Sequence, residues 1–171
     1  MKTTRKMTLS ALMLALALVL PFLTAQIQSI GKMLLPMHLP VLLAAYVVGG
    51  PWAMLVGAVA PLLRHLIWGM PPLVNAIGMT AELAAYGLVA GVVYSRSGKT
   101  NKDVFVSLII TMVAGRIVWG IVNFAVQSAL GNPFTLKMFM ASAFFNAIPG
   151  IILQLVAIPL LVAALKKYRL I

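Results

Sequence analysis

The sequence alternates between long apolar runs and short segments that are polar or rich in glycine and proline. The runs are close to the 20 or so apolar residues that a helix needs to cross a lipid bilayer. We therefore predict six membrane-spanning helices. Their expected bounds are Met7–Gln26, Leu34–Gly50, Trp52–Trp68, Leu73–Tyr94, Val104–Leu130 and Phe139–Leu165.

The segments between the runs have the composition of turns and loops. Gly49–Pro51 and Gly69–Pro72 are tight breakers, because glycine and proline end one helix and begin the next. Loops are also expected at Ile27–Lys32 and Gly131–Pro133. The nine residues Ser95–Asp103 form the longest hydrophilic stretch, which is too short for a separate domain.

The start of the chain has some features of a signal peptide, since Lys2, Arg5 and Lys6 precede the first apolar run. However, this run is longer than the 7–15 residues of a signal-peptide core. Leu23–Gln26 is also a poor match to the small-x-small pattern of a cleavage site. We therefore predict that the first run is a helix of the bundle.

Composition supports this fold class. Of the 171 residues, 63% are hydrophobic and only 9% are charged, whereas soluble domains are roughly 45–50% apolar and about 25% charged. The sequence thus predicts an all-α, multi-pass membrane protein in which residues 1–171 form a single six-helix domain. An ATP-hydrolysing domain does not fit within this length.

Charge predicts the orientation of the bundle. The net charge of +11 comes from 13 Lys and Arg against two acids, Glu82 and Asp103. Six spans place nine basic residues on one side, which predicts that both termini are cytoplasmic in a cell membrane. These residues are Lys2, Arg5, Lys6, Arg96, Lys99, Lys102, Lys166, Lys167 and Arg169. The charge is therefore attributed to topology and not to nucleic-acid binding.

Several kinds of chemistry are disfavoured. The absence of cysteine excludes disulfides and thiolate sites. With two histidines and two acids, neither a metal centre nor a cofactor is expected. Gly98-Lys-Thr100 resembles part of a phosphate-binding loop, but Val93 occupies the position where that motif requires its first glycine.

The candidate functional residues are polar side chains within the spans. Arg64, His65, Glu82 and Arg116 are ionisable, and a charge at the centre of a lipid-facing helix costs about 2.5–3.5 kcal/mol on insertion scales. Neutral polar residues accompany them in the predicted outer halves of the last three spans. They include Asn75, Thr80, Asn123, Gln127, Ser142 and Asn146. In the inner half of the fifth span, Ser107 and Thr111 are expected to bond their own backbone.

Two interpretations of these polar residues remain open. Arg64, Glu82 and Arg116 could form a buried ion-pair network that locks the helices together. Alternatively, they could line an outward-open pocket, because two arginines and His65 exceed one carboxylate and would attract an anion. We favour the pocket, with His38 at its entrance or in a solvated loop.

Pairs of small residues provide a second signal. Ala11 and Ala15 lie four positions apart on the first span and so share one face, where another helix can approach closely. Ala53 and Gly57 on the third span are spaced in the same way, as are Gly87 and Gly91 on the fourth. Each pair could serve internal packing or contact a separate protein.

Taken together, six short spans, cytoplasmic termini and the Ala11/Ala15 face resemble the substrate-binding S components of energy-coupling factor (ECF) vitamin transporters. Local segments are similar to the vitamin-type branch of that family. They are Leu35–Leu43, Ala60–Arg64, Gly69–Pro72, Ala81–Gly87, Gly115–Gly120 and Asn146–Gly150.

This resemblance implies a subunit that captures a vitamin near the outer side of the membrane. It also implies docking, through Ala11 and Ala15, on an ECF transmembrane coupling subunit that carries two ATPase subunits. The loops Gln26–Lys32, Gly69–Pro72 and Gly131–Lys137 would cover the ligand.

The positive excess favours a small anionic B vitamin such as pantothenate. The substrate-binding residues expected on this basis are His38, Arg64, His65, Asn75, Glu82, Arg116, Asn123 and Asn146. Two alternatives are weaker. An intramembrane enzyme could use Glu82 with His65 or Arg116, although it would have only one carboxylate within its spans. A self-sufficient secondary transporter would be expected to show internal repeats, and we find none.

Overall fold

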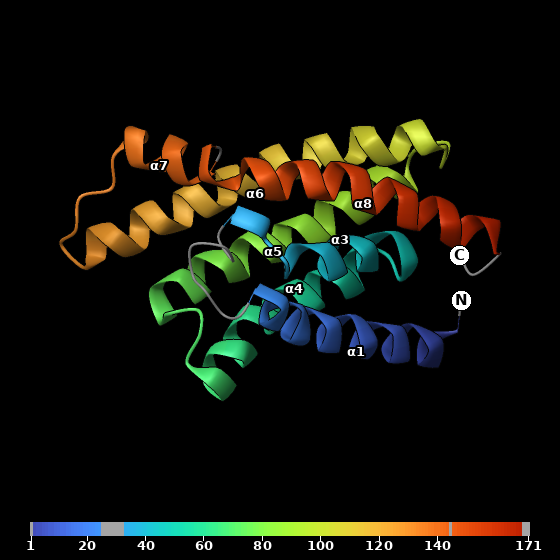
Figure 1. Cartoon of the computed structure of the whole chain (residues 1–171), viewed down its shortest axis with the longest axis horizontal. Coiled ribbons are helices and arrows are strands. Elements are labelled where there is room, and N and C mark those ends of the chain that lie inside the picture. The colour runs from blue at the N-terminus through green and yellow to red at the C-terminus, as the bar shows by residue number, and fades with distance from the viewer. Residues whose placement is uncertain (1, 25–32, 144, 169–171) are drawn as a thin grey trace.

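A computed structural model describes residues 2–24, 33–143 and 145–168, and within these ranges all regular structure is helical (Figure 1). The predicted loop Ile27–Lys32 lies outside them. The elements are α1 Thr3–Val19, η1 Leu20–Thr24, α3 His38–Val47, α4 Gly50–Trp68, α5 Leu73–Ser95, α6 Asn101–Ala129, α7 Leu136–Ala143, η2 Phe145–Ala147 and α8 Ile148–Lys167.

The prediction of an all-helical membrane bundle is confirmed in its main features. Within the described ranges, five segments are long and apolar enough to cross a membrane, and α3 is a shorter apolar helix. Large apolar side chains remain exposed on the outside of the bundle, including Ile121 at 64% and Ile117 at 53% on α6. Such a surface suits contact with lipid.

The predicted second span, Leu34–Gly50, is wrong in its extent. Helix α3 has only 10 residues, or about 15 Å of rise, half the thickness of the hydrocarbon core. It begins late because Leu35 has a φ of 50°, a left-handed conformation that a right-handed helix cannot contain. Pro40 is tolerated because it lies in the first turn. Most of α3 is buried, so this helix belongs to the core.

The predicted sixth span, Phe139–Leu165, is divided. Phe139 belongs to α7, which ends at Ala143, and α8 begins at Ile148 after the single turn of η2. Pro149 lies in the first turn of α8, where its missing N–H is tolerated but would interrupt a helix arriving from α7. The first span also differs from its prediction, since α1 already begins at Thr3 and gives way to η1 at Leu20.

The core is organised around α5, which packs against α3, α4 and α6. The contact between α4 and α5 depends on glycine: a Cβ atom on Gly57 would lie 2.3 Å from the Leu83 carbonyl oxygen, and one on Gly91 would lie 2.2 Å from the Gly50 nitrogen. Helix α1 packs on α3 and α4, and α8 packs on α3 and α6. The short helix α3 is therefore enclosed by four longer ones.

Both termini and the loop between α5 and α6 lie at the same end of the bundle (Figure 1). Lys166 Nζ donates to the Lys99 carbonyl at 2.6 Å, which joins the end of α8 to this loop. In the same loop, Thr100 and Asp103 cap α6 through reciprocal hydrogen bonds between backbone and side chains. Asp103 therefore has a structural role, and Glu82 is the chain's other acid.

Candidate functional site

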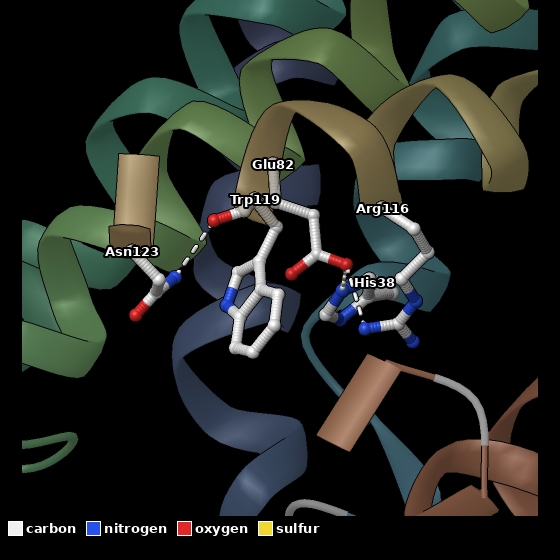
Figure 2. A network of polar contacts seen from close by, with 5 residues as sticks. All are labelled: His38, Glu82, Arg116, Trp119 and Asn123. Atoms are coloured by element: carbon white, nitrogen blue, oxygen red, sulfur yellow. Dashed lines mark hydrogen bonds and ion pairs between the residues drawn. The ribbon is translucent and has the colours of Figure 1, made fainter. Parts of the chain in front are cut away.

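The interior of the helix bundle contains a cluster of charged side chains centred on Glu82 of α5. Arg116 Nη1 on α6 lies 2.9 Å from Glu82 Oε1, and His38 Nε2 at the start of α3 lies 3.4 Å from the same oxygen. The three residues are 2%, 4% and 1% exposed, respectively. Figure 2 shows the Glu82 carboxylate pointing toward both partners. We call these three residues the polar cluster.

Several polar atoms around the cluster have no hydrogen-bond partner within the described part of the chain. They include Arg116 Nε and Nη2, His38 Nδ1 and the Tyr86 hydroxyl. Arg116 thus binds Glu82 through Nη1, whereas its Nε–Nη2 edge makes no hydrogen bond of full geometry, although the Tyr86 hydroxyl lies close to the guanidinium. This planar edge can bind a carboxylate through two parallel hydrogen bonds.

Asn123 and Trp119 extend the polar cluster along α6 (Figure 2). Asn123 lies two turns beyond Arg116 and therefore shares its face. It is 4% exposed, and its Nδ2 donates to the Trp119 carbonyl at 2.9 Å. Its side chain abuts α5 at Gly78, where an added Cβ would lie 2.3 Å from Asn123 Nδ2. An amide and an indole therefore lie on the same stretch of helix as the guanidinium.

Arg64 is buried but lies apart from the polar cluster. Its Nη1 donates to the Leu18 carbonyl near the end of α1. Its guanidinium carbon lies 4.8 Å from the centre of the Phe22 ring and 5.3 Å from that of Trp68. The cation is therefore satisfied by a carbonyl and two aromatic faces, and it joins α1 to α4.

The remaining sequence candidates make no hydrogen bond or ion pair with the polar cluster among the described residues. His65 Nδ1 is 2.8 Å from the Pro71 carbonyl oxygen, so it holds the turn between α4 and α5. Asn75 is half-buried in the first turn of α5, and Asn146 is exposed on η2. The positive excess that the sequence suggested is thus dispersed. Within the polar cluster, Glu82 balances Arg116 when His38 is neutral.

Sequence reasoning missed Gln154 on α8. Its side chain is fully buried, and neither its Nε2 nor its Oε1 has a hydrogen-bond partner among the described residues. A lone amide inside an apolar run was the available signal. The expectation for Ser107 is confirmed, since it donates to the Val104 carbonyl at 2.9 Å. The expectation for Thr111 is wrong, because its buried hydroxyl has no such partner.

No group of three or more His, Cys, Asp or Glu side chains suited to a metal ion occurs in the described ranges. The candidate site is therefore one of charge pairing and hydrogen bonding. Its features are a buried guanidinium with an edge open to a further partner, a histidine, the Asn123 amide and the Trp119 ring. Together they are suited to binding a polar small molecule.

A family model described as "ECF transporter, substrate-specific component" matches residues 5–162. The chain belongs to this family. ECF substrate-specific components bind small molecules and work with an energising module, and they are not enzymes. The intramembrane-enzyme alternative is therefore not supported. No curated protein and no solved structure matches the chain.

Proposed function

We propose that this ECF substrate-specific component captures a small anionic B vitamin, such as pantothenate, at the polar cluster. The observation that carries the proposal is the unsatisfied Nε–Nη2 edge of Arg116 in a buried site. Leaving such donors unpaired within a membrane is costly. A ligand carboxylate would compensate this cost with two charge-assisted hydrogen bonds.

Neighbouring residues support the same role. Glu82, which also contacts His38, holds the Nη1 side of the guanidinium, so the Nε–Nη2 edge has a defined direction. Asn123 is placed to contact a polar group of the ligand, and the Trp119 ring offers an apolar face. We infer that the end holding the termini faces the cytoplasm. Asn123 would then lie in the outer half of α6.

The surface of α1 supports docking on the energising module. Ala11 and Ala15 are exposed, while the opposite face of α1 buries Ser10, Met13 and Ala17. We propose that this exposed face binds an ECF transmembrane coupling subunit that carries two ATPase subunits. Small side chains would let a partner helix approach closely.

The test compares two arginines of similar burial by means of the same conservative change. The full chain, purified in detergent, is titrated with pantothenate by calorimetry, and native mass spectrometry identifies any molecule that co-purifies. Arg116→Lys is expected to weaken pantothenate binding at least about tenfold, because lysine keeps the charge but lacks the planar pair of donors. Arg64→Lys is the matched control and is expected to bind like the wild type.

Equal affinities for the wild type and Arg116→Lys would contradict the assignment of Arg116. Identification of a co-purified vitamin without an acidic group would contradict the anionic ligand class, while leaving substrate capture by this family member intact.

A further inference from the structure

Gln154 stands out among the buried polar residues that the polar cluster does not include. The side chain is 0% exposed, and both the donor and the acceptor of its amide lack partners among the described residues. An unsatisfied polar group in the interior destabilises the folded state, because it has lost its hydrogen bonds to water without replacement. A side chain that leaves both unsatisfied therefore requires an explanation.

Gln154 is a buried residue of α8, which packs against two helices that contribute to the polar cluster. One turn before Gln154, Gly150 contacts the chain directly: an added Cβ would lie 2.6 Å from the Met33 carbonyl oxygen and 3.0 Å from that of Leu34. From this contact, α3 and α8 run in the same direction (Figure 1). Four residues further along each chain are Gln154 and His38. Both residues thus follow closely after the contact between α8 and the chain just before α3.

The packing of α8 supports this placement. Gly150, Gln154 and Ile158 are spaced four residues apart and form the buried face of the helix. Helix α8 packs against α3 and α6, which are the helices that contribute His38 and Arg116 to the polar cluster. The amide of Gln154 thus lies within the same group of helices as the unsatisfied edge of Arg116.

The chemistry of the amide indicates what it would bind. A glutamine amide offers an N–H₂ donor and a carbonyl acceptor side by side. A ligand group pairs with both atoms of this amide if it presents its own acceptor and N–H donor side by side. Carboxamides, lactams and ureides are groups of this kind. A carboxylate would satisfy only the donor. Gln154 is thus complementary to a neutral, amide-like group.

We propose that Gln154 is a specificity-determining residue that binds a neutral, amide-like group of the substrate, while Arg116 binds its anionic end. This inference rests on the proposed function, because it takes the polar cluster to be part of the substrate site. It narrows the substrate class to molecules that carry both a carboxylate and a carboxamide, lactam or ureide. A site built in this way rejects analogues that lack the amide-like group, because its buried polar atoms are then left unpaired.

The experiment measures selectivity among three carboxylates with the full chain purified in detergent. The probes are pantothenate, which has an amide, biotin, which has a ureide, and nicotinate, which has neither. The wild type is expected to bind pantothenate or biotin at least tenfold more tightly than nicotinate. Gln154→Met, which is similar in size, is expected to reduce this preference to less than about threefold.

Two controls separate recognition from folding. Gln127→Met changes the same residue type at a position where Gln127 Oε1 accepts from Asn132 Nδ2 at 3.0 Å near the surface, and it is expected to keep the wild-type preference. Gln154→Asn shortens the side chain but keeps the amide, and it provides a second test if the methionine variant does not fold. If both variants fold, Gln154→Asn is expected to prefer the amide-containing probes over nicotinate more strongly than Gln154→Met does. If Gln154→Met does not fold, Gln154→Asn is expected to show a preference smaller than that of the wild type but not absent.

The outcomes distinguish this inference from the function on which it rests. If Gln154→Met keeps the full preference, or if Gln154→Asn alone folds and matches the wild type, Gln154 does not read an amide. If the wild type prefers nicotinate and Arg116→Lys abolishes its binding, the amide inference fails and the anionic site stands. If the wild type binds none of the three probes, both are rejected.

Discussion

Glu82 is the residue on which the polar cluster depends, because it holds both Arg116 and His38 in the interior. Removing one member of a buried ion pair leaves an uncompensated charge, at a cost of about 3–5 kcal/mol, whereas replacing both members with apolar residues is often close to neutral. The effect of the ion pair on stability can therefore be measured separately from its effect on ligand binding.

At this scale we predict that Glu82→Met lowers the midpoint of thermal unfolding in detergent by several degrees, because Arg116 is left without its carboxylate. The double variant Glu82→Met with Arg116→Met is expected to recover most of that loss and yet to bind no pantothenate. Unfolding is followed by circular dichroism and binding by calorimetry. A double variant that is less stable than Glu82→Met would show that the ion pair does not act as a unit.

The two intramembrane arginines have similar sequence contexts but different contacts in the fold. Arg64 and Arg116 look alike there, since each is a cation inside an apolar run. Their surroundings differ completely: Arg64 contacts the Leu18 carbonyl and two aromatic rings, and Arg116 contacts Glu82. The sequence could locate such groups but could not assign all their partners, because Leu18, Phe22 and Glu82 lie on other elements of the chain.

Among the elements, α1, α4 and α5 show two different uses of small residues. Gly87 and Gly91 on α5 contact the backbone of α4 at Ala53 and Gly50, so they serve internal packing. Ala11 and Ala15 on α1 are exposed instead. Pairs with the same spacing in the sequence are therefore buried between helices in one case and exposed on the surface in the other. Only the packing of the helices distinguishes them.

We predict that Gly87→Val destabilises the bundle, because the Cβ would lie 2.4 Å from the Ala53 carbonyl carbon and must push two helix backbones apart. Overpacking of this kind costs about 1–3 kcal/mol or more. The expected result is a smaller monodisperse fraction in size-exclusion chromatography and a lower unfolding midpoint. Ala15→Val adds two carbon atoms at an exposed position and is the matched control, which is expected to resemble the wild type. Similar losses in both variants would refute the packing argument.

For the whole molecule, capture and transport are expected to depend on different surfaces. Ala11→Trp places a large ring on the exposed face of α1, far from the buried face of that helix. We predict that this variant binds pantothenate with wild-type affinity but abolishes its ATP-dependent uptake into liposomes that contain the complete ECF complex. Leu23→Trp, at an exposed position on η1 beyond the proposed docking face, is the control and is expected to support uptake. Normal uptake by Ala11→Trp would refute docking through this face.

By itself, the sequence determined the class of the molecule. Apolar runs of about bilayer length, two acids among 171 residues and breakers of glycine and proline predict a helical membrane bundle. These properties are local, because each helix in lipid must satisfy its own backbone hydrogen bonds. The shortness of α3 and the division between α7 and α8 depend on turns whose conformation the composition does not specify.

The tertiary structure decided which polar groups meet. His38, Glu82 and Arg116 are separated by more than 30 residues in sequence, yet a single carboxylate oxygen joins them. Arg64 and His65 contact other partners instead. Gln154 is distinguished from other polar residues by its complete burial, which only the fold reveals. The physical reason is that the packing of neighbouring helices fixes which face of each helix is buried and beside which neighbour. No property of one helix alone contains that information.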